Sequence, residues 1–232
     1  MAITLWQSAR IVGAELIGGM GVAELDATVQ WWGRRMFDVS RTTLQTDGDE
    51  HAPPEPCVVL SNHRSLLDIP AVVVAFPGRL TFVAKEELSA VPLFGRALRR
   101  FGVVFVDRGR RTKAVRQLGE AAERVAEGTS IWIAAEGRRT HSRAPGRFKK
   151  GPFHVAGRLG APLLPTWIEG TAEVIPPASV ASHSGRVVRV FFGPPIPTTG
   201  VDLGDRAALA ALMERAHAAM EALAERASEE AT

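Results

Sequence analysis

VVLSNHRSLLDIP, residues 58–70, is the segment around which the rest of the chain is organised. A run of apolar residues with the length of a strand ends at Ser61, a polar turn follows, and a helical pattern begins near Asp68. Pro70 supports a helix that starts there, because proline is tolerated in the first helical turn, where backbone N–H groups have no helical partner. The segment therefore predicts a strand, a turn that contains His63, and a helix.

Asp68 follows His63 by five positions, which is too far for two side chains on one helix face, since positions i and i+4 stack. We therefore expect Asp68 to reach back to His63 from the start of the helix. A carboxylate that accepts a hydrogen bond from one imidazole nitrogen leaves the other nitrogen free to act as a base. No Ser or Cys is placed like a nucleophile elbow, so we expect the attacking hydroxyl to come from a substrate.

A structural interpretation of the same residues is open beside the catalytic one. Ser65 and Asp68 fit the capping pattern in which a side chain satisfies the first backbone donors of a helix. In that interpretation Asp68 only caps the helix, and His63 is an ordinary turn histidine.

Four blocks of the chain together resemble the glycerolipid acyltransferases of the lysophosphatidate acyltransferase family. Residues 62–68 are similar to the family's N-H-x-x-x-x-D motif, residues 102–108 to its G-x-x-F-I-D-R block, residues 134–140 to its F-P-E-G-T-R-S block, residues 161–165 to its proline-containing fourth block, and residues 148–151 to the basic segment after the third block. The blocks occur in the family's order and cover about residues 30–195. The resemblance favours catalysis by His63.

Strand and helix patterns alternate along most of the chain. The predicted strands are residues 57–60, 80–84, 103–106, 130–134, 162–168 and 186–192. Such alternation predicts an α/β fold with a largely parallel or mixed sheet covered by helices, and the resemblance implies a single acyltransferase-type sandwich. We divide the chain into a helical, membrane-docking segment at residues 1–45, expected as a pair of helices with a break near Gly18 and Gly21, and an α/β acyltransferase domain at residues 46–232. Residues 46–56 read as a polar loop and residues 205–227 as a long terminal helix.

Polar side chains follow the ends of four successive predicted strands: His63, Lys85, Arg108 and Glu136. Ligands of open α/β sheets bind at the carboxyl ends of the strands, so these residues are expected to converge. Lys85 is a candidate for substrate binding from this position alone.

The resemblance implies roles for residues in the second and third blocks. Arg108 and Arg139 would hold an acceptor phosphate, which the planar guanidinium can bind through two hydrogen bonds. Glu136 would orient an arginine or the acceptor's hydroxyls, and Gly137 would let the backbone approach closely. The alternatives are that Arg108 pairs with Asp107 or is solvated, and that Glu136 belongs to a structural salt bridge.

The third block departs from the family's pattern. Ala134 and Ala135 stand where the family has Phe and Pro, and Arg138 stands where it has Thr. The extra arginine strengthens anion binding and leaves the exact acceptor open.

The activity implied by the resemblance is transfer of a fatty acyl group from acyl-CoA or acyl carrier protein to the free hydroxyl of a lysophospholipid. Lysophosphatidate giving phosphatidate is the expected case, with a His–Asp base pair, no acyl-enzyme and no cofactor besides the thioester. The alternatives are another lysolipid acceptor and a non-enzymatic module that binds anionic lipid. Since no Cys/His cluster has metal-ligand spacing, we expect no metal site.

The charge of the chain is small in total, +3 over 232 residues, but unevenly placed. Residues 96–116 hold eight Lys/Arg and one acid, and residues 138–150 hold six basic residues and no acid. From residue 202 onward the chain has seven acids and three arginines. This asymmetry indicates an anionic partner. Nucleic acid is not expected, because few aromatic residues lie among the basic ones and no recognition motif is present.

The N-terminal segment combines aromatic, aliphatic and arginine side chains, as interfacial membrane helices do. The residues expected to enter the headgroup region are Val29, Trp31, Trp32, Met36 and Phe37, with Arg34 and Arg35 at the lipid phosphates. The alternative is that this stripe packs onto the domain. The apolar run at residues 11–23 is too short to span a bilayer, and the single Cys57 suits a reducing compartment. We expect a cytoplasmic protein, peripheral on the inner face of the cell membrane.

Overall fold

The computed structural model describes residues 2–16, 18–107, 109–176 and 182–230, and within these residues a seven-stranded sheet forms the centre of the molecule. The strands are β1 (Thr43–Asp47), β2 (Val58–Ser61), β3 (Leu80–Lys85), β4 (Val104–Val106), β5 (Ser130–Ala134), β6 (Leu163–Glu169) and β7 (Val187–Phe192). Their spatial order is β1-β7-β6-β2-β5-β3-β4.

The five strands β6, β2, β5, β3 and β4 are parallel, so their carboxyl ends lie along one edge of the sheet. The strand β7 runs antiparallel to β6, and β1 pairs parallel with β7. The sheet is therefore mixed, and the predicted α/β class is confirmed. The strands β2 and β5 are buried along their whole length, as expected for parallel strands covered on both faces.

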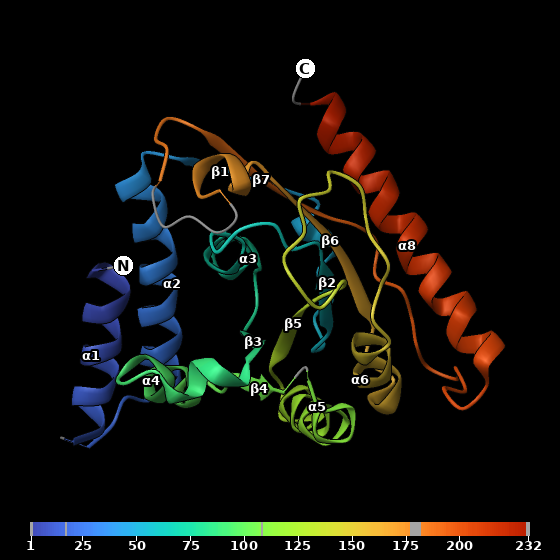
Figure 1. Cartoon of the computed structure of the whole chain (residues 1–232), viewed down its shortest axis with the longest axis horizontal. Helices are drawn as coiled ribbons and strands as arrows, with labels where there is room; N and C mark the ends of the chain where they lie inside the picture. The colour runs from blue at the N-terminus through green and yellow to red at the C-terminus, as the bar shows by residue number, and fades with distance from the viewer. Residues whose placement is uncertain (1, 17, 108, 177–181, 231–232) are drawn as a thin grey trace.

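Helices cover both faces of the sheet (Figure 1). They are α1 (Ala2–Leu16), α2 (Val22–Ser40), α3 (Asp68–Ala75), α4 (Phe94–Arg100), α5 (Arg111–Ala126), α6 (Gly151–Leu159), α7 (Thr171–Val174) and α8 (Arg206–Glu229). Two 3₁₀ turns, η1 (Asp49–His51) and η2 (Glu86–Ala90), complete the described elements. The helices α2, α3 and α4 lie on one side, with α1 outside them, and α5, α6 and α8 lie on the other side (Figure 1).

Successive strand residues contribute to separate cores because strand side chains alternate between the two faces. Leu60 and Ile131 belong to the core under α5, α6 and α8, whereas Val59 and Trp132 belong to the core under α2 and α3. This alternation aims Trp132 toward the side of the sheet that carries α3.

Residues 43–47 form the strand β1. The prediction was wrong here, because it placed residues up to 45 in the N-terminal helical segment and the following residues in a loop. The sequence of β1 is TLQTD, whose burial alternates only weakly and which contains a single large aliphatic residue, Leu44. The strand forms by pairing with β7, more than 140 residues away, from Thr43 opposite Val187 to Asp47 opposite Phe191. The division of the chain at residue 45 stays a prediction.

The helix α2 packs closely on α3, with its Gly33 facing that helix. A Cβ atom added at Gly33 would lie 2.6 Å from Val74 Cγ2 and 3.3 Å from the Pro70 carbonyl oxygen. Only glycine permits this approach without a shift of either helix.

Most of the apolar residues on α2 that were expected to enter the membrane pack against the domain instead. The prediction was wrong for these residues, and the alternative of packing onto the domain is correct for them. Val29 and Phe37 are buried, and Trp32 and Met36 are partly buried against the same core. Trp31 alone of the five is exposed, at 43%. None of the helices in the described ranges is long and apolar enough to cross a bilayer.

Candidate active site

His63 and Asp68 form the pair that the sequence predicts. His63 lies in the turn after β2, and Asp68 is the first residue of α3. The His63 Nδ1 and Asp68 Oδ2 atoms are 2.7 Å apart, and the two side chains are 13% and 1% exposed. The carboxylate therefore fixes the ring from a buried position.

Asp68 also accepts hydrogen bonds from a hydroxyl and from backbone donors of the turn before α3, whereas the N-cap residue Leu67 makes no side-chain cap hydrogen bond, so the interpretation that Asp68 only caps the helix is wrong. Its Oδ2 accepts hydrogen bonds from the backbone N–H groups of Arg64, at 2.7 Å, and Ser65, at 2.8 Å. Its Oδ1 accepts from Thr171 Oγ1 at 2.5 Å. These donors hold the carboxylate in one orientation, with Oδ2 directed at the His63 ring.

The other nitrogen of His63, Nε2, is free to act. None of the described residues forms a hydrogen bond with it, while Nδ1 is held by Asp68. The ring stands edge-on to Trp132, with centroids 5.3 Å apart and planes at 86°. The Trp132 Nε1–H donates to Ser61 Oγ at 2.6 Å, and that hydroxyl donates to the Asn62 carbonyl at 2.7 Å. The indole is thus fixed where it limits the rotation of His63.

Asn62 joins the catalytic turn to the neighbouring strand β6. Its side-chain amide donates to the Ile168 carbonyl and accepts from the Ile168 N–H, both at 2.8 Å. Arg64 adds an ion pair with Glu169 at 3.0 Å on the same strand. The two residues that flank His63 in the chain, Asn62 and Arg64, therefore both anchor the turn to β6.

Glu136 lies in the turn that follows β5, the strand beside β2, and is 4% exposed. Its Oε1 accepts from the Gly146 N–H at 3.3 Å, and among the described residues its buried Oε2 has no partner. Burial raises the pKa of Glu136, and the hydrogen bonds from backbone N–H groups and the nearby His63 offset part of that rise. The alternative of a structural salt bridge fails for the described residues, none of which pairs a cation with Glu136.

The loop after β5 returns to His63. The Thr140 N–H donates to the His63 carbonyl at 2.8 Å. Gly137 has a φ of +70°, and a Cβ atom added there would lie 3.1 Å from Lys149 Cγ. Arg138 and Arg139 are exposed, and neither forms an ion pair within the part of the chain that the structure describes.

The structure brings together His63, Asp68 and Glu136 but separates Lys85 from them. Lys85 ends β3, with β5 between β3 and β2, and its exposed ammonium pairs with Glu87 at 3.1 Å. Arg108 lies outside the described residues. No group of three or more His, Cys, Asp or Glu within the described ranges has a geometry that could hold a metal ion.

Three residues of this site carried no signal in the sequence: Trp132, Thr171 and Glu169. Each reaches the catalytic turn from a strand or helix more than 65 residues further along the chain. Local motifs cannot show such contacts, because sheet order decides which strands become neighbours.

Comparison with known proteins gives a consistent result. The family model described as "Acyltransferase" matches residues 43–169, more than half of the chain. The 1-acyl-sn-glycerol-3-phosphate acyltransferase alpha of Bos taurus is 35% identical over 170 residues, which cover 72% of this chain and 58% of that protein. The Homo sapiens protein of the same name is 34% identical, covering 72% and 59%, and the 1-acyl-sn-glycerol-3-phosphate acyltransferase of Saccharomyces cerevisiae is 31% identical, covering 70% and 56%. The chain thus spans less than two thirds of these relatives.

A solved structure shows the same fold over almost the whole chain. The 1-acyl-sn-glycerophosphate (LPA) acyltransferase PlsC from Thermotoga maritima superposes with a TM-score of 0.75 at 22% sequence identity. The match covers 98% of this chain and 95% of that protein, including the N-terminal helices.

Proposed function

The chain belongs to the acyltransferase family, and from that premise we propose that it transfers a fatty acyl group from an acyl thioester to the free hydroxyl of a lysophospholipid. Lysophosphatidate giving phosphatidate is the proposed reaction, in agreement with the names of the relatives. The observation that carries the proposal is the pair of His63 and the buried Asp68. Within the described part of the chain, the second imidazole nitrogen and the Oε2 atom of the nearby Glu136 have no hydrogen-bond partner.

The proposed reaction is a direct transfer with His63 as general base. His63 Nε2 takes the proton of the acceptor hydroxyl while that oxygen attacks the thioester carbonyl, and Asp68 stabilises the imidazolium. The tetrahedral intermediate then expels the thiolate, which receives the proton from His63 as a thiol. No group of the protein is acylated, so both substrates must be bound together.

Glu136 and the arginines of the third block are proposed to position the acceptor. Glu136 Oε2, which has no partner among the residues that the structure describes, would accept a hydrogen bond from an acceptor hydroxyl. Arg139 would bind the acceptor phosphate, together with Arg108, for which the sequence predicts the same role. Arg138 adds a cation beside Arg139 and is proposed to tune the choice of headgroup.

The activity test is release of free thiol from acyl-CoA in the presence and absence of lysophosphatidate. We expect release only when the acceptor is present. A panel of lysophosphatidate, lysophosphatidylglycerol and lysophosphatidylethanolamine ranks the acceptors. If no acceptor supports release but the protein still binds anionic vesicles, the non-enzymatic lipid-binding alternative replaces the proposal.

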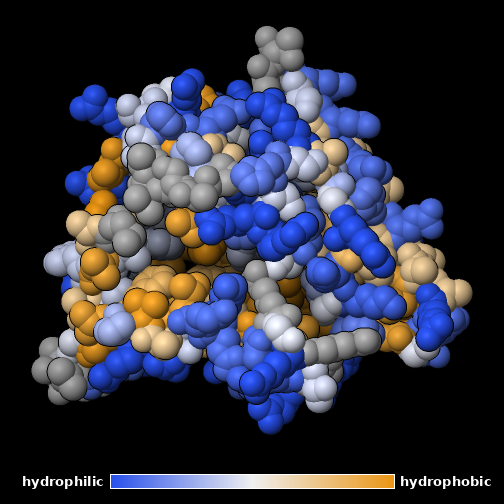
Figure 2. Space-filling view, viewed as in Figure 1, coloured by the Kyte–Doolittle hydropathy of each residue, from blue (hydrophilic) through white to orange (hydrophobic). Residues whose placement is uncertain are grey.

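We also propose that the protein binds the inner face of the cell membrane peripherally, through α1 and α2. Trp6 is 52% exposed and Leu5 49%, and the rings of Trp6 and Trp31 lie 5.5 Å apart. Arg10 stacks over the Trp6 ring at 5.1 Å. Apolar residues gather over α1 and α4 in Figure 2. An exposed tryptophan pair beside arginine suits the headgroup region of an anionic bilayer.

A further inference from the structure

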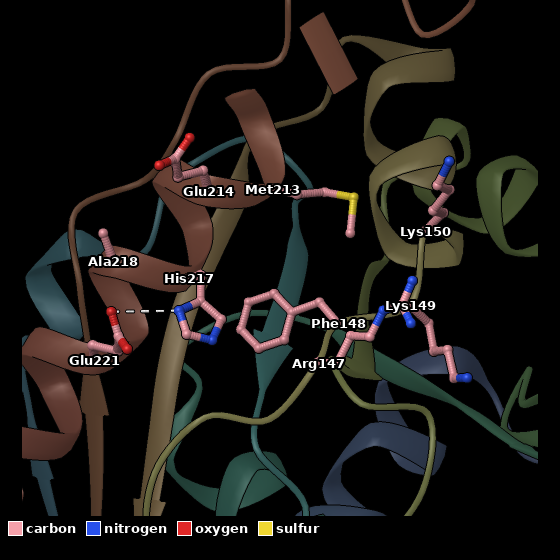
Figure 3. A pocket seen from close by; sticks show the side chains of 9 residues that line it. All are labelled: Arg147, Phe148, Lys149, Lys150, Met213, Glu214, His217, Ala218 and Glu221. Atoms are coloured by element: carbon pink, nitrogen blue, oxygen red, sulfur yellow. Dashed lines mark ion pairs between the residues drawn. The ribbon is translucent and has the colours of Figure 1, made fainter. Parts of the chain in front are cut away.

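A cavity of about 760 Å³ lies between the segment at residues 147–150 and the helix α8 (Figure 3). His63, Asp68 and Glu136 are not among the residues that line it. The cavity is therefore a second feature, separate from the proposed base and from the unpartnered carboxylate.

The two walls of the cavity carry opposite charge. Arg147, Lys149 and Lys150 form the basic wall, and no acidic residue in the described ranges pairs with any of them. On α8, Glu214 faces the cavity, and Glu221 pairs with His217 at 3.4 Å. The basic wall can therefore bind an anionic group of a ligand. The carboxylates on the opposite wall can act only as hydrogen-bond acceptors, so they suit a part of the ligand that carries N–H or O–H groups.

An aromatic contact joins the two walls between the charges. The rings of Phe148 and His217 lie 4.9 Å apart, and Figure 3 shows them side by side. Phe148 is 6% exposed and also stacks on Phe153, with centroids 6.3 Å apart. This contact ties the basic segment to α8 and fixes the distance between the walls.

The basic segment is in direct contact with the proposed active site. The Lys149 N–H donates to the Ala135 carbonyl at 2.8 Å, and the Gly146 N–H donates to Glu136. The chain at residues 146–149 therefore lies against the chain at residues 135–137. The basic wall of the cavity and the loop that carries Glu136 are thus neighbours in the fold.

Direct transfer requires two anion sites, because both substrates are phosphorylated and must be bound at once. The acceptor's phosphate is close to its reacting hydroxyl, so its site has to adjoin His63. In acyl-CoA the phosphates and adenosine lie at the far end of the pantetheine arm from the thioester, so their site has to lie away from His63. The exposed Arg138 and Arg139 are next to Glu136, and Arg147 and Lys150 are in the cavity. The basic residues at 138–150 therefore form two separate groups, one beside Glu136 and one in the cavity.

We propose, as an extension of the proposed function, that the cavity between residues 147–150 and α8 binds the phosphorylated adenosine head of acyl-CoA. The diphosphate and the 3′-phosphate lie along Arg147, Lys149 and Lys150. The adenine amino group and the ribose hydroxyl face the carboxylates of α8. A ligand that is anionic over its whole surface fits this cavity less well, because it would meet Glu214 and Glu221.

The test variant is Arg147→Ala combined with Lys150→Ala. Lys149 is left in place because its side chain packs beside Gly137. With acyl-CoA as the varied substrate, we expect KM for acyl-CoA to rise about tenfold, since two exposed cation–phosphate contacts are lost. The KM for the acceptor should stay unchanged. Arg215→Ala, an exposed cation on α8 outside the cavity lining, is the matched control and should leave both constants unchanged.

Shortened donors make the test specific for the head of the molecule. S-acyl-pantetheine lacks the nucleotide, so the wild type and the double variant should have the same KM for this donor. The wild type's preference for acyl-CoA over acyl-3′-dephospho-CoA should shrink or vanish in the double variant. A general defect in folding or loop structure would instead affect all three donors equally.

Binding of coenzyme A itself, measured by calorimetry, separates this inference from the proposed activity. If no acceptor supports turnover, the proposed function fails, but coenzyme A binding that weakens in the double variant still supports the site. The inference is overturned if the double variant keeps the wild-type affinity for coenzyme A. It is also overturned if the acceptor's KM rises instead, or if the wild type uses acyl carrier protein and does not bind coenzyme A.

Discussion

His63 and Asp68 differ in how much of the fold depends on them. His63 contacts Asp68 and Trp132 through its ring, whereas Asp68 accepts four hydrogen bonds from four different residues. An amide in place of the carboxylate would direct N–H groups at donors, which leaves buried donors unsatisfied at a cost of about 1–3 kcal/mol each.

We therefore predict different results for His63→Ala and Asp68→Asn. His63→Ala should lower kcat about 10²–10⁴-fold, the usual contribution of a general base, with little change in melting temperature. Asp68→Asn should lower both kcat and the melting temperature. Steady-state kinetics and thermal unfolding of the two variants measure this. Near-normal turnover by His63→Ala would show that the base has been assigned to the wrong residue.

Glu136 links stability to pH. Burial raises its pKa in the folded protein above the value in the unfolded chain, which is about 4.3. Between these two pKa values the unfolded chain has released the proton that the folded protein still holds, so the free energy of unfolding falls as pH rises. Above the folded pKa the penalty is complete and constant.

Glu136→Gln should remove this pH-dependent penalty, because the amide is neutral and its oxygen can still accept from the Gly146 N–H. The variant's gain in unfolding free energy over the wild type should be larger at pH 8 than at pH 4.5, and its use of the acceptor should be weaker. Urea unfolding at the two pH values measures the difference. A gain that is the same at both values would show that burial does not raise the pKa of Glu136 in the folded protein.

At the scale of single elements, the helix α2 shows where sequence reasoning succeeds and where it stops. Its break from α1 near Gly18 and its apolar periodicity were predicted correctly. Its orientation was not, because a stripe of apolar residues fits a bilayer and a protein core equally well. The close approach at Gly33 and the hydrogen bond from Gln30 Nε2 to the Val73 carbonyl turn the stripe toward α3. Both depend on a partner helix more than 30 residues away.

The exposed tryptophans predict how α1 and α2 contribute to membrane binding. Trp6→Ala with Trp31→Ala should weaken association with anionic vesicles about tenfold or more, because each removes a large, half-exposed apolar group. The remaining dependence on salt should persist, since Arg10, Arg34 and Arg35 are retained. Flotation with vesicles at low and high salt measures both effects.

The control for this experiment removes exposed apolar residues from a different part of the molecule. Leu159→Ala with Val187→Ala changes side chains that are 38% and 39% exposed on α6 and β7. This pair should float like the wild type. Equal loss in both double variants would mean that α1 and α2 have no special role in docking.

At the scale of the whole molecule, the sheet order determines what could be foreseen. The five parallel strands place the residues after β2 and β5 side by side, so the strand-end argument was correct for His63 and Glu136, but it wrongly included Lys85, because β5 lies between β3 and β2. The support from Thr171 and the cavity against α8 could not be predicted, because they depend on how distant helices pack. The antiparallel orientation of β7, which pairs with β1, could not be predicted from local sequence either.

Cys57 offers a probe of this whole arrangement. It is fully buried just before β2, its N–H donates to Ser130 Oγ at 3.1 Å, and its carbonyl accepts from the Ile131 N–H at 3.0 Å. Burial raises the pKa of its thiol to about 12, so almost no reactive thiolate exists at neutral pH in the folded protein. A reagent can reach it only when β2 separates from β5.

We predict that a thiol-specific reagent leaves Cys57 unlabelled in the native protein and labels it completely in urea. Labelling should begin at the urea concentration at which circular dichroism reports loss of secondary structure, because the sheet that buries Cys57 spans both cores. As Cys57 is the single cysteine of the chain, Cys57→Ala is the blank for the assay. Labelling well below the unfolding transition would instead reveal a partial opening in which β5 and the third block detach from β2 while the rest stays folded.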